Sequence, residues 1–385
     1  MIRIWVLSIF LLGLSTCEAQ KTKAWTSVGA EQLDELLPIL KDKRVGLVVN
    51  NTSLVGKTHL ADTLVALKVQ VKRIFGPEHG FRGDAADGEH VKDEIDSKTG
   101  VPVVSLYGKN YKATADQVKD LDILIFDIQD VGARFYTYIS TMHYLMETCA
   151  ENNKQLIILD RPNPNGSYVD GPIMQPGLKS FVGMHPIPIT HGMTVGEFAQ
   201  MINGEGWLAG GKKCNLSVIK MKNWKHEDDY SLPVRPSPNL PNDQAIRLYP
   251  SICLFEGTVI SLGRGTPMPF QILGNPELKD MTFTFTPVPI KGVSIEPPLK
   301  DKLCYGMDLR SITPARKVDL QFLLLFYQKY PDKEKFFTPY FDKLAGTAQL
   351  KQQIKDGLSE EQIRASWKPG LDAFKAKRKN YLLYP

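Results

Sequence analysis

Five short apolar runs punctuate the first 160 residues, and each has the length and composition of a β-strand. They lie at 45–49, 71–75, 101–104, 123–126 and 156–159. Three of them are apolar at nearly every position, which is typical of strands buried on both faces of a parallel sheet. Between the last two, apolar residues recur at helical spacing from Ile139 to Cys149 and predict a helix over 135–151. This alternation predicts an α/β fold with a Rossmann-like parallel sheet.

Polar residues that can take part in catalysis or ligand binding follow four of these runs directly. They are Asn51 after the first, Glu78 and His79 after the second, Asp127, Gln129 and Asp130 after the fourth, and Asp160 and Arg161 after the fifth. Open α/β sheets bind ligands beyond the carboxyl ends of their strands. We therefore expect the active site at this edge of the sheet.

The second half of the chain has a different pattern. A stretch rich in Gly and Pro spans 171–190, and Thr194 with Glu197 then has the spacing of a capping box at the start of a helix. A polar loop at 235–242 contains Asn239, and the end of the chain is helical in pattern. We predict a Rossmann-like catalytic domain over 25–176 and an auxiliary α+β domain over 177–385.

The chain opens on an apolar stretch. Arg3 precedes the run 4–14, which is too short to span a bilayer and is followed by small and polar residues. The pattern predicts a secretory signal peptide over 1–19 and an exported, periplasmic protein. The segment ending at Cys17 also resembles a bacterial lipobox, so lipid anchoring through Cys17 is an alternative. No later run is long and apolar enough for a transmembrane segment.

Composition changes this picture little. Of the 385 residues, 43% are hydrophobic and 23% charged, as in an ordinary globular chain. The net charge of +5 is small for this length, and the basic run at 375–379 has no aromatic residues between its charges. We therefore expect no nucleic-acid partner. The four cysteines after Cys17 lack CxxC spacing, which disfavours a zinc cluster.

Other kinds of site are disfavoured by their missing motifs. One loop is crowded with His79, Asp84, Asp87, Glu89 and His90, but it lacks HExxH and EF-hand spacing, so we expect no metal. No GxGxxG follows the first strand, which disfavours a dinucleotide, and no GxSxG is present for a serine nucleophile. We expect no cofactor.

The carboxylates after the strands favour glycoside hydrolysis, which needs an acid and a second group acting as base or nucleophile. Glu78 is the main candidate, because a glutamate in a Pro-Glu-His sequence, partly walled from water, suits a general acid. Asp127 or Asp130 would activate water or stabilise an oxocarbenium-like transition state. Asp160 and Glu256 are further candidates. Each of these carboxylates also has a structural interpretation, as a cap of nearby backbone or one half of an ion pair.

The longest motifs together resemble a known family. They are FGPEHGFRG, FDIQDVGARFYTYISTM, LDRPNPNG, PITHGMTVGE, SPNLP, and FEGT followed by GRGTPMPF. They resemble a bacterial family long catalogued as a domain of unknown function, some of whose members are described as exo-acting β-N-acetylmuramidases of peptidoglycan recycling. The resemblance extends from about residue 25 to the C-terminus.

This resemblance implies two domains, Rossmann-like and auxiliary, with the active site in a cleft between them. The implied reaction removes a terminal β-linked N-acetylmuramic acid from the non-reducing end of a peptidoglycan fragment. The glutamate of the PEHG motif corresponds to Glu78, which is therefore the main catalytic carboxylate. The identity of the second catalytic group stays open, and so does the choice between inverting, retaining and substrate-assisted mechanisms.

The residues fit such a substrate. Muramic acid carries a lactyl carboxylate, for which an arginine is the natural bidentate partner. The candidate arginines in the motif loops are Arg82, Arg134, Arg161 and Arg264. The acetamido group needs a donor and an acceptor, which Asn51, Gln129 or Asn239 would supply. The predicted substrate-binding set is completed by His79, His191, Asp160 and Glu256.

A second function remains open. An exported protein could bind glycans or muropeptides without cleaving them. Aromatic residues near the polar loops would then stack on sugar faces, and Phe81, Tyr107, Tyr136, Tyr138 and Phe270 are the candidates. Turnover of a muraminide separates the two functions.

Overall fold

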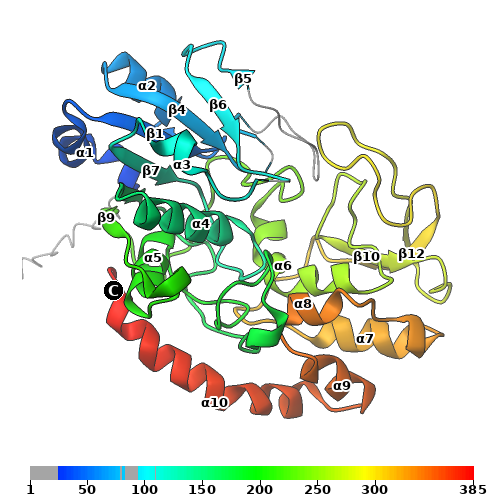
Figure 1. Cartoon of the computed structure of the whole chain (residues 1–385). Helices are drawn as coiled ribbons and strands as arrows, with labels where there is room; N and C mark the ends of the chain where they lie inside the picture. Colours follow the sequence, from blue (N-terminus) through cyan, green and yellow to red (C-terminus); the bar gives the residue numbers. More distant parts are fainter. Residues whose placement is uncertain (1–24, 79, 83–93, 109) are drawn as a thin grey trace, which may run out of the picture.

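All five predicted strands form, and they lie in one mostly parallel sheet (Figure 1). The computed structural model describes residues 25–78, 80–82, 94–108 and 110–385, so the predicted signal peptide and Cys17 lie outside the described residues. The strands of the sheet are β1 (Arg44–Val49), β4 (Gln70–Gly76), β5 (Glu94–Ile95), β6 (Pro102–Ser105), β7 (Ile123–Asp127), β8 (Gln155–Leu159) and β9 (Asn215–Ile219).

The strand order is that of a doubly wound fold. Six parallel strands lie in the order β6-β4-β1-β7-β8-β9, and β5 joins the edge antiparallel to β6. Numbered along the chain, the parallel strands read 3-2-1-4-5-6, the Rossmann order. Strand β9 lies beyond residue 176, so the sheet continues past the predicted domain boundary.

Helices cover both faces of this sheet. They are α1 (Leu33–Leu40), α2 (Leu60–Ala66), α3 (Ala115–Val118), α4 (Tyr138–Glu151) and α5 (Val195–Gly204). Val45 and Leu47 of β1 belong to one buried cluster with α1 and α2, whereas Val48 belongs to the cluster of α3, α4 and α5. Successive side chains of a strand point to opposite faces, so a run of apolar residues serves both layers.

The predicted capping box at the start of α5 is confirmed. The Thr194 hydroxyl accepts the Glu197 backbone N–H at 3.2 Å, and the Glu197 carboxylate accepts the Thr194 N–H at 2.9 Å. Glu197 also accepts the Leu383 backbone N–H at 2.8 Å. The same side chain therefore starts a helix and holds the end of the chain against it.

The remainder of the chain adds a small antiparallel sheet and several helices, the predicted α+β pattern. The strands are β10 (Ile272–Asn275), β11 (Phe283–Phe285) and β12 (Cys304–Asp308), in the order β10-β12-β11. The helices are α6 (Asp243–Ile252), α7 (Gln321–Lys329), α8 (Phe341–Ala345), α9 (Gln349–Lys355) and α10 (Glu360–Arg378). A hairpin of β2 (Leu54–Val55) and β3 (Thr58–His59) follows β1. No helix in the described part of the chain is long and apolar enough to cross a membrane.

The C-terminal helix returns to the first sheet. Helix α10 runs back along the lower edge of the molecule toward α5 and β9 (Figure 1). Beyond it, the Tyr384 hydroxyl donates to Asp160 at 2.7 Å, just past the end of β8. The two halves of the chain are therefore joined at the C-terminus as well as through the central segments.

Arg134 ties the start of α4 to the C-terminal part of the molecule. Its side chain is only 1% exposed and donates to the backbone carbonyls of Pro172, Ile187, Leu344 and Ala345 at 2.7–2.9 Å. Burial lowers the pKa of Arg134 to about 9. Gly346 has a φ of +74°, and a Cβ there would lie 2.5 Å from Nη2 of Arg134. This placement corrects the expectation that Arg134 binds substrate, because the side chain is enclosed by protein and both of its Nη groups donate to backbone carbonyls.

We expect Arg134→Met to lower the free energy of unfolding by at least about 3 kcal/mol, because four buried carbonyls lose their donor. Urea denaturation followed by circular dichroism measures the change. Arg310 forms an exposed ion pair with Asp308 and is the matched control, so Arg310→Met should stay within about 0.5 kcal/mol of wild type. Equal losses in the two variants would contradict this role for Arg134.

Candidate active site

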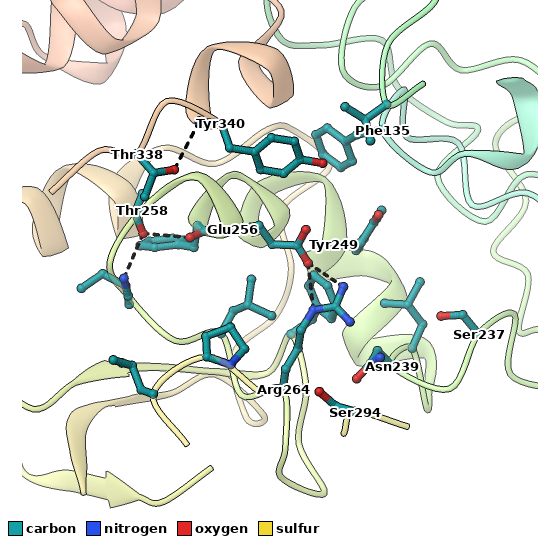
Figure 2. Close-up of a pocket in the computed structure, with 18 of the residues that line it drawn as sticks. Phe135, Ser237, Asn239, Tyr249, Glu256, Thr258, Arg264, Ser294, Thr338 and Tyr340 are labelled. Atoms are coloured by element: carbon teal, nitrogen blue, oxygen red, sulfur yellow. Dashed lines mark hydrogen bonds and ion pairs between the residues drawn. The ribbon is translucent and has the colours of Figure 1, made fainter. Parts of the chain in front are cut away.

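A cavity of about 950 Å³ is lined by residues from both halves of the chain (Figure 2). The N-terminal half contributes Glu78 after β4 and residues 135–138 at the start of α4. The C-terminal half contributes Asn239, Glu256 and Arg264 from its loops. Of the predicted site residues, the structure brings Glu78, Asn239, Glu256 and Arg264 together in one cavity.

Glu78 lies two residues beyond the last residue of β4, at the edge where the sheet was expected to present chemistry. Thr137 Oγ1 donates to its Oε2 at 3.5 Å, and the Tyr138 hydroxyl donates to its backbone carbonyl at 3.4 Å. Burial, with a smaller contribution from the Glu78 charge, raises the pKa of Tyr138, so this phenol keeps its proton and remains a donor. Glu78 is thus a half-buried carboxyl group in the cavity wall, and the two hydroxyl groups hold its side chain and its backbone in place.

Glu256 and Arg264 form an ion pair inside the cavity. Nε and Nη2 of Arg264 both donate to Oε1 of Glu256, at 2.9 and 2.6 Å (Figure 2). The two side chains are 23% and 18% exposed, and the guanidinium lies 5.2 Å from the centre of the Phe270 ring. The pair places a positive and a negative group on the same wall, with each orienting the other.

Asn239 presents a buried acceptor on that wall. It is 3% exposed, and its Nδ2 donates to the Val293 carbonyl at 3.1 Å. The carbonyl of Val293 fixes the orientation of the amide, because only the NH₂ group can donate to it. Oδ1 of Asn239 accepts no hydrogen bond from any residue of the described chain. A buried acceptor without a partner is costly, and a ligand donor would satisfy it.

Asp127 and Arg161 do not reach this cavity. Asp127 is fully buried, and Nε and Nη2 of Arg161 donate to its two oxygens at 2.6 and 2.9 Å. Arg161 also donates to the Leu54 carbonyl at 3.0 Å. This corrects the expectation that Asp127 acts on the substrate and that Arg161 binds it: the two charges satisfy each other in the interior.

Asp130 and His191 lie buried and are not among the lining residues. Oδ2 of Asp130 accepts the Gly132 N–H at 2.6 Å and lies 3.9 Å from Nε2 of His191. Burial raises the pKa of Asp130 to about 7 and lowers the pKa of His191 to about 3. Their predicted contact with substrate is corrected by this placement, because both side chains are enclosed by protein.

Three more predicted residues have structural partners instead. Asp160 accepts the hydroxyls of Thr194 and Tyr384, both at 2.7 Å, and burial raises its pKa to about 6. Gln129 donates to backbone carbonyls. Asn51 donates to the Arg235 carbonyl at 3.1 Å. None of the three is a lining residue. Asp160 and Gln129 are enclosed by protein, which corrects their predicted substrate contacts, whereas Asn51 is half-buried and its predicted contact stays a prediction.

Arg82 is also committed elsewhere. It donates to Asp96 at 2.9 and 2.8 Å and to Asp62 at 3.1 Å, and it does not line the cavity. The charges on Asp96 and Asp62 account for its position, and its expected role at the lactyl group stays a prediction. The prediction for His79 falls outside the described residues.

Aromatic residues contribute more of the cavity than the motifs suggested. Of the predicted stacking residues, Tyr107, Tyr136, Tyr138 and Phe270 line it and Phe81 does not. The lining residues that sequence reasoning missed include Tyr111, Thr137, Tyr249, Ser294 and Tyr340. The tyrosine-rich FYTY sequence was a usable signal for the segment 135–138. Tyr340 gave none, because only the fold brings the start of α8 to the cavity.

The described part of the chain contains no group of three or more His, Cys, Asp or Glu side chains that could hold a metal ion. Most of the loop from His79 to His90 lies outside the described residues. Cys149, Cys214, Cys253 and Cys304 are buried free thiols.

Comparison with known proteins identifies the family. Sequence profiles of the N-terminal and C-terminal parts of exo-beta-N-acetylmuramidase NamZ match residues 45–244 and 247–384. The chain belongs to the NamZ family. The peptidoglycan beta-N-acetylmuramidase NamZ of Bacillus subtilis (strain 168) is 43% identical over 394 residues, which cover 95% of this chain and 92% of that protein.

Solved structures give the same assignment. A DUF1343 family protein from Bacteroides fragilis NCTC 9343 is 48% identical with a TM-score of 0.88, over 94% of this chain and 99% of that one. A second DUF1343 protein from the same organism is 32% identical with a TM-score of 0.79 and the same coverage. The NamZ fold therefore extends over nearly the whole described chain.

The buried Asp130 carboxyl should make stability depend on pH. Its folded pKa of about 7 lies above its ordinary 3.8, so the folded protein holds a proton that the unfolded chain has released. Raising the pH from about 4 to 7 therefore lowers the free energy of unfolding, by roughly 4 kcal/mol at most from this group.

Asp130→Asn should remove this fall while keeping the acceptor for Gly132. We expect the wild-type minus variant difference, from urea unfolding between about pH 4 and 8, to decrease up to pH 7 and then stay level. A difference that is constant across this range would show that Asp130 ionises normally in the folded protein.

Proposed function

We propose that this protein is an exo-acting glycoside hydrolase that removes terminal β-linked N-acetylmuramic acid from the non-reducing end of peptidoglycan fragments. Membership of the NamZ family supports the reaction class. The observation that carries the proposal at the level of residues is the shared cavity, where Glu78 faces the same space as Arg264 and Asn239. Those three side chains supply an acid, a partner for a carboxylate and an acceptor for an amide.

Glu78 takes the role of general acid in this proposal. Cleavage of a glycosidic bond needs a proton on the departing oxygen. Glu78 is half-buried at the end of β4, and the Thr137 and Tyr138 hydroxyls hold its side chain and backbone in place. A carboxyl group in such a pocket can give up its proton as the bond to the leaving sugar breaks.

Glu256 is the second carboxylate available at the cavity. Asp127 and Asp130 are enclosed elsewhere, and the lining residues Glu277 and Glu296 are exposed on its rim. Arg264 donates to Oε1 of Glu256, and we assign Oε2 to the contact with water or the sugar. Glu256 therefore replaces the two aspartates as the group that stabilises the oxocarbenium-like state, alongside the N-acetyl group of the substrate.

Arg264 is assigned to the lactyl carboxylate by elimination. Arg82, Arg134 and Arg161 are paired away from the cavity, and Arg264 is the arginine among its described lining residues. A guanidinium has five N–H groups in a planar fork, so it can serve Glu256 and a substrate carboxylate together. Asn239 Oδ1 is assigned to the acetamido N–H.

A cell-wall substrate agrees with the predicted export of the chain. Cleavage of a signal peptide over 1–19, a periplasmic location and lipid attachment at Cys17 stay predictions. Fractionation of cells that express the full-length chain, with wild type beside Cys17→Ala, would decide among them.

The function is tested by release of chromophore from an aryl β-N-acetylmuraminide beside the matching β-N-acetylglucosaminide. We expect cleavage of the muraminide. Glu78→Gln should lose about 100-fold or more in kcat on the natural disaccharide, where the leaving sugar needs a proton. The loss should be smaller on an aryl substrate whose leaving group departs as an anion.

Glu334 is an exposed glutamate that pairs with Lys355 and does not line the cavity, so Glu334→Gln is the control and should behave as wild type. Normal turnover of the disaccharide by Glu78→Gln would remove Glu78 as the acid. A folded wild-type protein that binds muropeptides but cleaves neither aryl substrate would favour the non-catalytic binding function.

Arg264→Met should narrow the preference for the muraminide over the glucosaminide. The loss of a charge-assisted contact with the lactyl group is expected to reduce the ratio of the two kcat/KM values about 10- to 100-fold. Arg264→Lys should lie in between, because lysine keeps the charge and loses the planar fork.

The double variant Glu256→Gln/Arg264→Met controls for the glutamate that the single substitution leaves unpaired. In this double variant, the ratio of kcat/KM for the muraminide to kcat/KM for the glucosaminide should be as low as in Arg264→Met. A ratio that stays at the wild-type value, while both rates fall together, would mean that Arg264 only supports the cavity wall.

A further inference from the structure

An aromatic strip leads from the cavity onto helix α4. We use this name for Tyr107, Tyr111, Phe181 and Tyr144, all half-buried. The first three line the cavity, whereas Tyr144 does not. The ring centres lie 6.2 Å apart for Tyr107 and Tyr111, 4.3 Å for Tyr111 and Phe181, and 6.3 Å for Phe181 and Tyr144. The strip is thus a continuous row of rings that starts inside the cavity and ends outside it.

The strip begins beside the loop of Glu78. Tyr107 follows Leu106, whose backbone N–H donates to the Gly76 carbonyl at 2.8 Å, two residues before Glu78. Phe181 is held against α4, because the Ser140 hydroxyl donates to its carbonyl at 2.7 Å. Tyr144 lies on α4, six residues after the cavity-lining Tyr138.

The polar groups assigned to the terminal sugar lie on the other part of the wall. Asn239, Glu256 and Arg264 all come from the C-terminal half of the chain, whereas the strip comes from the N-terminal half. A general acid must lie next to the oxygen of the leaving sugar. With the muramic acid held by the C-terminal loops, the leaving side of the bond therefore faces Glu78 and the rings that continue from it.

We infer that the aromatic strip is the subsite for the leaving part of the substrate, the N-acetylglucosamine and the sugars that follow it in a peptidoglycan strand. Aromatic rings give large, rigid contact areas, and tyrosine hydroxyls add a polar handle at the edge. Continuity with the cavity selects this occupant over an unrelated ligand. The inference rests on the proposed function, and it assigns the direction in which the glycan lies.

Binding to the Glu78→Gln protein tests the strip without turnover. A tetrasaccharide of alternating N-acetylmuramic acid and N-acetylglucosamine, with muramic acid at its non-reducing end, is titrated by calorimetry beside free N-acetylmuramic acid. We expect Tyr144→Ala and Phe181→Ala in this background to raise the Kd of the tetrasaccharide about fivefold or more relative to that of the monosaccharide. Tyr144→Phe should restore the wild-type ratio, because it keeps the ring.

Tyr327 is the matched control. It is a half-buried tyrosine that stacks on Phe337 at 5.5 Å and does not line the cavity, so Tyr327→Ala should leave the Kd ratio unchanged. An unchanged ratio in folded Tyr144→Ala and Phe181→Ala proteins would overturn the subsite. Absence of muraminide cleavage by wild type would instead overturn the proposed function. The ratio of the two Kd values would still show whether the aromatic strip binds the sugars that follow the muramic acid.

Discussion

The hydrogen bonds of the buried Arg134 guanidinium are the interaction on which the cavity most depends. It gathers backbone carbonyls from the segment 172–187 and from the end of α8, which are far apart in the sequence. Residues 135–138 follow it directly and line the cavity. An arginine enclosed in this way keeps its position only while those carbonyls do. The same set of hydrogen bonds therefore holds the segment 135–138 and helix α8, which follows the lining residue Tyr340.

The sheet explains why the chemistry lies where it does. Polar residues gather past the ends of the parallel strands, as the doubly wound topology requires. At the switch point between β1 and β7, however, the Asp127–Arg161 ion pair fills the space with protein. The open space lies instead past β4 and β6, next to Glu78 and Tyr107, and the loops of the C-terminal half close it. The fold thus places a cavity, lined by both halves of the chain, at this edge of the sheet.

The sequence predicted the sheet well, because continuous apolar runs and helical spacing are local signals. It predicted the edge that presents Glu78 for the same reason. It could not rank Arg82, Arg134, Arg161 and Arg264, since an arginine in a loop motif looks the same whether it meets Asp96, backbone carbonyls, Asp127 or an open cavity. Tertiary contacts decide that question, as they do for Tyr340, whose position depends on packing between distant segments.

The most direct test of the proposed function is a crystal structure of the Glu78→Gln protein with the unhydrolysed disaccharide of N-acetylmuramic acid and N-acetylglucosamine. We expect the muramic acid in the cavity, with its lactyl carboxylate on Arg264, its acetamido N–H on Asn239 and the glycosidic oxygen within hydrogen-bond distance of residue 78. A sugar bound with its glycosidic oxygen away from residue 78, or with its lactyl group toward the N-terminal wall, would contradict it.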